Sequence, residues 1–128
     1  MEAEGGRIDR SKPRGLLRLW LAFGASARGF AGAFRDEASF RQELGFAAFV
    51  IPVGLWLGHS GVERALLIGP VVLILIIELV NSAIEATVDR IGYERHTLAG
   101  LAKDLGSAAV FMSFVLLGGV WLLVLFGR

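Results

Sequence analysis

The chain has 128 residues, enough for one domain, and 55% of them are hydrophobic, with a mean hydropathy of +0.63. A soluble domain of this size needs a more polar surface, so the composition excludes an ordinary soluble domain and favours a membrane protein. The net charge of +1 offers no excess for a nucleic-acid partner, and the lack of cysteine excludes disulfides, thiolate metal sites and cysteine nucleophiles.

The first 15 residues form a polar, charged tail without the apolar core of a secretory signal peptide. Residues from about 16 to 40 are expected to form an amphipathic helix in the headgroup plane. Apolar residues such as Trp20 and Phe23 alternate there with arginines, which interrupt the apolar run too often for a membrane span.

Three apolar segments follow, at about 41–58, 65–88 and 105–126, and we expect each to span the membrane. With the surface helix they would form one integral-membrane domain over 16–128. The first segment is short, and the charged residues that precede its apolar part, Arg41 and Glu43, are expected near the interface. The third contains no charge.

Basic residues indicate the orientation of the spans. They gather before the first span and in the loop after the second, and they are rare in the other loop and at the C-terminus. The N-terminus and the second loop are therefore expected in the cytoplasm, and the C-terminus outside.

The second span carries polar groups at helical spacing. In ELVNSAIEATVD, residues 78–89, the side chains of Glu78, Asn81 and Glu85 share one face. At 1.5 Å per residue, Glu78 lies roughly 16 Å deeper than Asp89. Ionised groups at such depth indicate function, although the same face would also suit polar packing inside a helix bundle. A shallow Glu85 is accessible to a water-soluble cation or nucleotide, and a deep Glu78 is placed to act as a base on a lipid hydroxyl.

The loop before the third span supplies a cation. AGLAKDLGS places Lys103 and Asp104 at the membrane surface, where the lysine either neutralises a phosphate or only extends its ammonium group to the interface. The single His96 is more typical of a solvated loop. No phosphate-binding loop of the P-loop or protein-kinase type occurs.

Three segments resemble the prokaryotic diacylglycerol kinase family of small integral-membrane enzymes. They are ELVNSAIEATVDRIG at 78–92, DEASFRQE at 36–43 and AGLAKDLGSAAV at 99–110, and the resemblance covers about Arg18 to the end of the third span. The chain departs from the best-known members in its surface helix, where Ala25 and Ala27 replace bulky aromatic residues and Leu21 stands where a lysine can occur.

The resemblance implies an all-α membrane protein of the bacterial inner membrane. It implies a homotrimer with one surface helix and three spans per subunit, and active sites shared between neighbours. It also implies that ATP phosphorylates diacylglycerol to phosphatidic acid, with Mg²⁺ as cofactor and without any nucleic acid.

The resemblance also implies roles for single residues. Glu78 matches the general base, and Glu37 and Glu85 match the acids that bind Mg²⁺. The positions that match nucleotide contacts are Arg18, Glu37, Glu85, Glu94, Arg95, His96, Lys103 and Asp104. The positions that match the lipid substrate or the reacting centre are Arg18, Glu78, Asn81 and Ser107.

Two alternatives stay open from the sequence. One is an undecaprenol kinase of the same family, because the acceptor depends on pocket shape. The other is a non-enzymatic membrane protein, such as a scaffold, an accessory subunit or an ion-conducting bundle, whose acids would line a polar interface or path.

Overall fold

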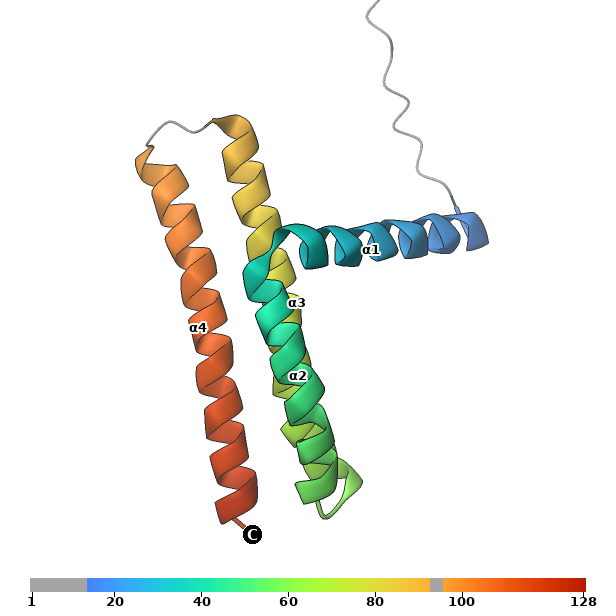
Figure 1. Ribbon diagram of the computed structural model, residues 1–128, viewed down its shortest axis with the longest axis vertical. Coiled ribbons are helices and arrows are strands. Elements are labelled where there is room, and N and C mark those ends of the chain that lie inside the picture. The colour runs from blue at the N-terminus through green and yellow to red at the C-terminus, as the bar shows by residue number, and fades with distance from the viewer. Residues whose placement is uncertain (1–13, 93–95) are drawn as a thin grey trace, which may run out of the picture. The chain divides into compact units, whose positions relative to one another are not determined.

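The computed structural model describes residues 14–92 and 96–128, and its regular structure there is entirely helical. The four helices are α1 (Leu16–Asp36), α2 (Ala38–Leu57), α3 (Gly61–Ile91) and α4 (Thr97–Phe126) (Figure 1). The chain divides into two units after Gly32, and each unit is described by itself. The all-helical class predicted from the sequence is confirmed.

Most of α1 belongs to the first unit and is amphipathic. Trp20, Phe23 and Phe30 recur at intervals of three and seven residues, which places them on one side of a helix, while Arg18 and Arg28 lie on the other. The three aromatic side chains are exposed in the described chain. The helix therefore presents a continuous apolar face that its own unit does not cover.

The chain leaves helical geometry at one residue, Glu37, which is extended and precedes α2. The helix expected over 16–40 therefore ends at Asp36, and the chain enters α2 three residues earlier than expected. Arg41 stabilises this break, because its guanidinium donates hydrogen bonds to the carbonyl oxygens of Phe34 at 2.7 Å and Arg35 at 3.0 Å. The last carbonyl oxygens of a helix have no partner within it, so these two hydrogen bonds satisfy acceptors at the C-terminal end of α1.

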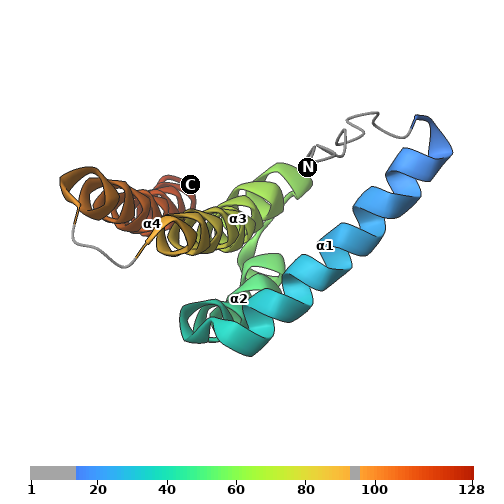
Figure 2. The ribbon, with the colours of Figure 1, turned by 90° about the horizontal axis from the view of Figure 1, so that it is seen from above.

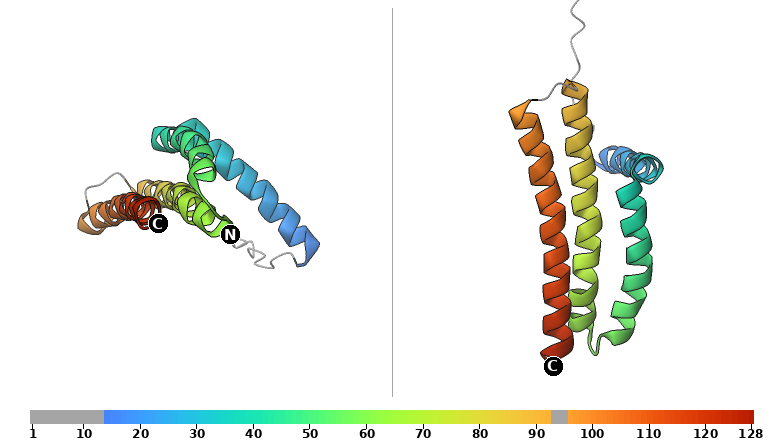
Figure 3. Two further views of the ribbon diagram at one scale, coloured as in Figure 1. Left: turned by 90° about the horizontal axis from the view of Figure 1, so that it is seen from below. Right: turned by 60° about the vertical axis from the view of Figure 1, so that its left-hand side comes forward.

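The second unit is an antiparallel bundle in which α3 is the central helix. It contacts both α2 and α4 and runs opposite to them (Figures 2 and 3). A small apolar core of Ala47, Val71, Ile74 and Leu117 joins the three helices. Since α3 has 31 residues and α2 has 20, α3 is longer than α2 by about 16 Å.

Two contacts join α2, α3 and α4 at Leu67. Gly54 of α2 lets the helices pack tightly, because a Cβ there would lie 3.3 Å from the Cβ of Leu67 and 3.5 Å from the Trp121 ring. The indole N–H of Trp121 on α4 also donates a hydrogen bond of 2.9 Å to the carbonyl oxygen of Leu67. All three helices therefore meet at Leu67.

The α2–α3 turn is held by Arg128, which follows α4. Arg128 contacts the α2–α3 turn, donating to the carbonyl of Leu57 and to Glu63 at 3.2 Å, and it lies 2.8 Å from the Nε2 of His59. The end of α4 is thus fixed beside the turn, and Glu78 and Glu85 lie further along α3 from it.

Among the described residues, α3 and α4 are the helices long and apolar enough to cross a membrane. Length and composition support this statement, which agrees with two of the three expected spans. The first expected span, 41–58, lies almost wholly in α2, which carries Arg41 and Glu43 in its first two turns.

Candidate functional site

The buried face of α3 changes from apolar to polar along its length. Leu67, Val71 and Ile74 are fully buried, and Glu78 and Asn81 continue the same stripe with only 5% and 9% of their surface exposed. The spacing of three or four residues keeps all of them on one side of the helix. The predicted face of Glu78, Asn81 and Glu85 therefore points into the bundle, with Glu85 partly buried.

A second carboxyl group, that of Glu43 on α2, adjoins Glu78 and interacts with it. From the sequence, Glu43 was expected only near the interface and without a role. A signal was present, because Phe40, Glu43, Ala47 and Gly54 follow a helical spacing, and the structure buries three of them and half-buries Glu43. The chain thus pairs two acids across α2 and α3.

Two further acids act on Glu78 through their charges, Glu85 on α3 and Glu37 at the start of α2. Glu37 makes no capping hydrogen bond to its helix. Beside it, Arg35 donates hydrogen bonds of 3.0 and 3.1 Å to Asp36, and this contact lowers the pKa of the Asp36 carboxyl from its usual value. Asp36 is therefore neutralised by its neighbour, while Glu37 belongs electrostatically to the acids around Glu78.

Three buried polar atoms near these acids lack a hydrogen-bond partner within the described chain: Glu43 Oε2, Asn81 Oδ1 and Ser82 Oγ. A buried polar atom without a partner costs about 1–3 kcal/mol, so such atoms are few in folded proteins and call for an explanation. Their gathering on neighbouring turns of α2 and α3 indicates a site built to receive polar groups. The amide of Asn81 also donates a long hydrogen bond of 3.5 Å to Glu85 Oε1.

Lys103 of α4 lies at the end of the bundle where α3 terminates. Its ammonium group forms an ion pair of 2.7 Å with Asp89 of α3, and both side chains are about two-fifths exposed. This partner was not predicted, because residues 14 positions apart on different helices carry no local signal in the sequence. Asp104 and Ser107 are exposed on the same stretch of α4.

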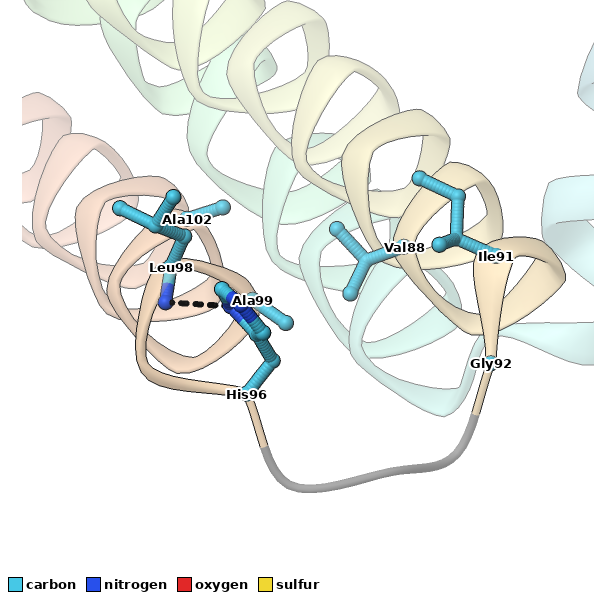
Figure 4. Close-up of a pocket in the computed structure, with 7 residues that line it drawn as sticks. All are labelled: Val88, Ile91, Gly92, His96, Leu98, Ala99 and Ala102. Atoms are coloured by element: carbon cyan, nitrogen blue, oxygen red, sulfur yellow. Dashed lines mark hydrogen bonds between the residues drawn. The ribbon is translucent and has the colours of Figure 1, made fainter.

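A pocket of about 480 Å³ lies beside this ion pair, between the end of α3 and the start of α4 (Figure 4). Its lining is mostly apolar, from Val88 and Ile91 on α3 to Leu98 and Ala102 on α4, with His96 at its edge. The Nδ1 of His96 accepts a hydrogen bond of 3.1 Å from the backbone N–H of Leu98 and so caps α4. A neutral imidazole then carries its proton on Nε2, which remains a donor.

Some predicted site residues are not brought together here. Glu94 and Arg95 lie outside the described residues. Arg18 belongs to the first unit, and its side chain is exposed there. The nucleotide-binding roles of these three residues stay predictions.

The donor atoms suit a hard cation, although no cluster of three or more His, Cys, Asp or Glu in the described chain is arranged to hold a metal alone. Mg²⁺ prefers oxygen ligands and commonly uses one or two carboxylates together with substrate phosphates. Glu37 and Glu85, whose charges both act on Glu78, supply such carboxylates. The residues therefore fit a Mg²⁺ ion that a phosphate chain helps to bind.

Comparison with known proteins gives a consistent result. The model of the family described as prokaryotic diacylglycerol kinase matches residues 24–125. A diacylglycerol kinase of Pseudomonas aeruginosa is 50% identical over 113 residues, which cover 88% of this chain and 92% of that protein. Those of Haemophilus influenzae and Escherichia coli are 44% and 43% identical over 115 and 114 residues, covering 90% and 89% of this chain and 98% and 93% of those proteins.

Proposed function

The chain belongs to the prokaryotic diacylglycerol kinase family, and from this we propose how its own residues phosphorylate a lipid. It is an enzyme, a diacylglycerol kinase of the membrane. The donor is ATP and the product is phosphatidic acid. A bond forms between the diacylglycerol hydroxyl oxygen and the γ-phosphorus, the bond from this phosphorus to ADP breaks, and the hydroxyl proton leaves to a base.

One observation carries the mechanism, the burial of Glu78 beside Glu43 on the polar part of the α3 stripe. A buried carboxylate is shielded from water and can receive the proton of an alcohol held against it. Glu78 is therefore the general base, and Glu43 holds it in place from α2. Phosphoryl transfer requires mainly positioning and charge neutralisation, so few protein groups suffice.

The more exposed acids serve the nucleotide. Glu37 and Glu85 would hold Mg²⁺, and the ion would supply neutralisation of charge on the phosphate chain. Lys103 offers its ammonium group to the same phosphates, exchanging Asp89 for a phosphate oxygen. Its position at the water-accessible end of the bundle supports this role.

The remaining predicted residues surround these groups. Asp104, His96, Glu94, Arg95 and Arg18 contact the nucleotide. Asn81 and Ser107 lie near the reacting centre, and Arg18 also reaches the lipid substrate. The pocket at His96 supports a nucleotide contact at this end of α3 and α4.

The placement in the membrane follows the same proposal. Residues 41–58 of α2 form a third span beside α3 and α4, and α1 lies on the cytoplasmic surface of the inner membrane. The apolar face of α1, exposed in the described chain, supports this placement. The N-terminus is cytoplasmic and the C-terminus periplasmic. Three chains form a homotrimer, whose neighbouring subunits complete each site.

A direct assay tests this function. The purified protein in mixed micelles with γ-labelled ATP and Mg²⁺ should transfer label to diacylglycerol and form labelled phosphatidic acid. Undecaprenol in the same micelles tests the other acceptor, and we expect it to receive far less label. Absence of labelled phosphatidic acid, or equal labelling of both acceptors, would contradict the proposal. The kinase family excludes a purely non-enzymatic scaffold.

A further inference from the structure

Gly106 of α4 is buried and faces Asn81 of α3. A Cβ atom at Gly106 would fall on the Oδ1 of Asn81 and lie 3.2 Å from its Cγ. Because Gly106 has no side chain, the Asn81 amide can occupy the space beside it. The α4 backbone bounds that space on one side.

Hydrogen bonds within the described chain hold this amide only weakly. Its Oδ1 is buried without a partner in the described chain, and its Nδ2 donates only the long bond to Glu85. On the side of α4 the amide lies so close to Gly106 that no Cβ atom fits between them. The position of Asn81, and with it the contact to Glu85, depends on α4 having no side chain at this point.

The clash that a larger residue would cause is local. The atom in the way is the far end of a rotatable side chain, so a methyl group at residue 106 displaces the amide before it displaces either helix. The neighbouring Lys103–Asp89 ion pair also joins α3 and α4.

We propose that Gly106 is a positioning residue for phosphoryl transfer, which holds the Asn81 amide against Glu85 by contributing no side chain of its own. The inference rests on the proposed kinase function, in which Asn81 lies near the reacting centre. In this proposal Gly106 acts on the reaction indirectly, through the position of Asn81.

The kinetic test compares Gly106→Ala with Gly118→Ala. Both glycines lie on α4, but a Cβ at Gly118 meets nothing within 4 Å. Because a displacement of about 1 Å can cost on the order of 10²-fold in rate, kcat should fall by about 10- to 100-fold in Gly106→Ala. The KM for ATP should change by less than about threefold, since phosphate contacts remain, and Gly118→Ala should match the wild type.

Removal of the Asn81 side chain provides the decisive cross-check. In an Asn81→Ala background, which is slow itself, adding Gly106→Ala should cause no further loss, because no amide remains to be displaced. If Gly106→Ala assembles poorly, the double variant should assemble normally. Equal loss from Gly106→Ala in both backgrounds, of rate or of assembly, would overturn the inference.

A spectroscopic measurement separates this inference from the kinase function. Asn81 is the only asparagine in the chain, so labelling the side-chain nitrogen of asparagine gives one amide NH₂ signal. Gly106→Ala should shift this signal and Gly118→Ala should not. An unshifted signal would contradict the positioning role even if the wild type is an active kinase, whereas an inactive wild type with a shifted signal would contradict only the proposed function.

Discussion

Glu37 and Asp36 are adjacent carboxylates with opposite environments. Asp36 is neutralised by Arg35, whereas Glu37 acts electrostatically on the buried Glu78. This difference assigns the proposed metal role to one of two neighbouring acids and makes the other a matched control.

Glu37→Gln should raise the Mg²⁺ concentration needed for half-maximal activity by about tenfold or more, because the number of charged ligands sets the affinity for the ion. A Mg²⁺ titration of kinase activity measures it. Asp36→Asn should titrate like the wild type, and an equal shift in both variants would argue against a specific metal ligand.

Lys103 forms an ion pair with Asp89 and is also proposed to bind phosphate. A loss of activity in a Lys103 variant therefore needs a test that separates these two roles. Lys103→Met should raise the KM for ATP by about 10- to 100-fold, the range for losing a hydrogen bond to a charged group. Asp89→Asn should not reproduce this effect. Since the ion pair is well exposed, Asp89→Asn should also lower the unfolding free energy by less than about 1 kcal/mol. Identical kinetics of both variants would mean that Lys103 acts only through Asp89.

At the scale of helices, α3 divides its buried face into an apolar part that packs the bundle and a polar part that forms the site. Leu67, in the apolar part, receives both the close approach of Gly54 and the hydrogen bond from Trp121. The core contacts should therefore affect stability separately from catalysis.

Trp121→Phe removes the indole donor and should lower the unfolding free energy by about 1 kcal/mol, the usual net value of one hydrogen bond. Thermal unfolding in detergent measures this loss, and kcat should stay near that of the wild type. Trp56→Phe, at a site 81% exposed, is the control and should leave stability unchanged. No difference between the two variants would show that the hydrogen bond does not stabilise the bundle.

The sequence predicted those features that depend on local periodicity. Glu78, Asn81 and Glu85 share a face because a helix repeats every 3.6 residues, and α3 buries Glu78 and Asn81 as that spacing requires. The end of the first helix was predicted at about residue 40, but the structure places it at Asp36. Arg41, which follows the break, binds the last carbonyl groups of that helix, and no proline or glycine marks the break in the sequence. Glu43 was missed because the sequence does not show which residue of α3 faces it, although its spacing from Phe40 and Ala47 indicated a shared helix face.

Contacts between helices were beyond prediction from the sequence. The Lys103–Asp89 pair and the Gly106–Asn81 contact join residues distant in the chain, and each depends on how far α4 slides along α3. That register follows from the packing of many side chains and not from any local pattern.

At the scale of the whole molecule, the bundle has two different ends. Lys103, Asp89 and the acids lie toward one end, and Arg128 ties the α2–α3 turn at the other. The distribution of basic residues supports our proposal that the first end faces the cytoplasm.

Single cysteines test this orientation, since the natural chain has none. In intact cells whose outer membrane is made permeable, a membrane-impermeant maleimide should label Gly61→Cys at the start of α3 and not Thr97→Cys at the start of α4. Both positions are exposed, so their accessibility depends on topology. The reverse pattern would invert the proposed placement.

The most direct measurement of the central claim is the turnover of Glu78→Gln, assayed with diacylglycerol, ATP and Mg²⁺ in mixed micelles. Glutamine keeps the shape of glutamate and cannot accept the hydroxyl proton, so labelled phosphatidic acid should form at least about 10²-fold more slowly, while the detergent-solubilised assembly keeps its wild-type size. Near-normal turnover by a correctly assembled Glu78→Gln variant would contradict the account.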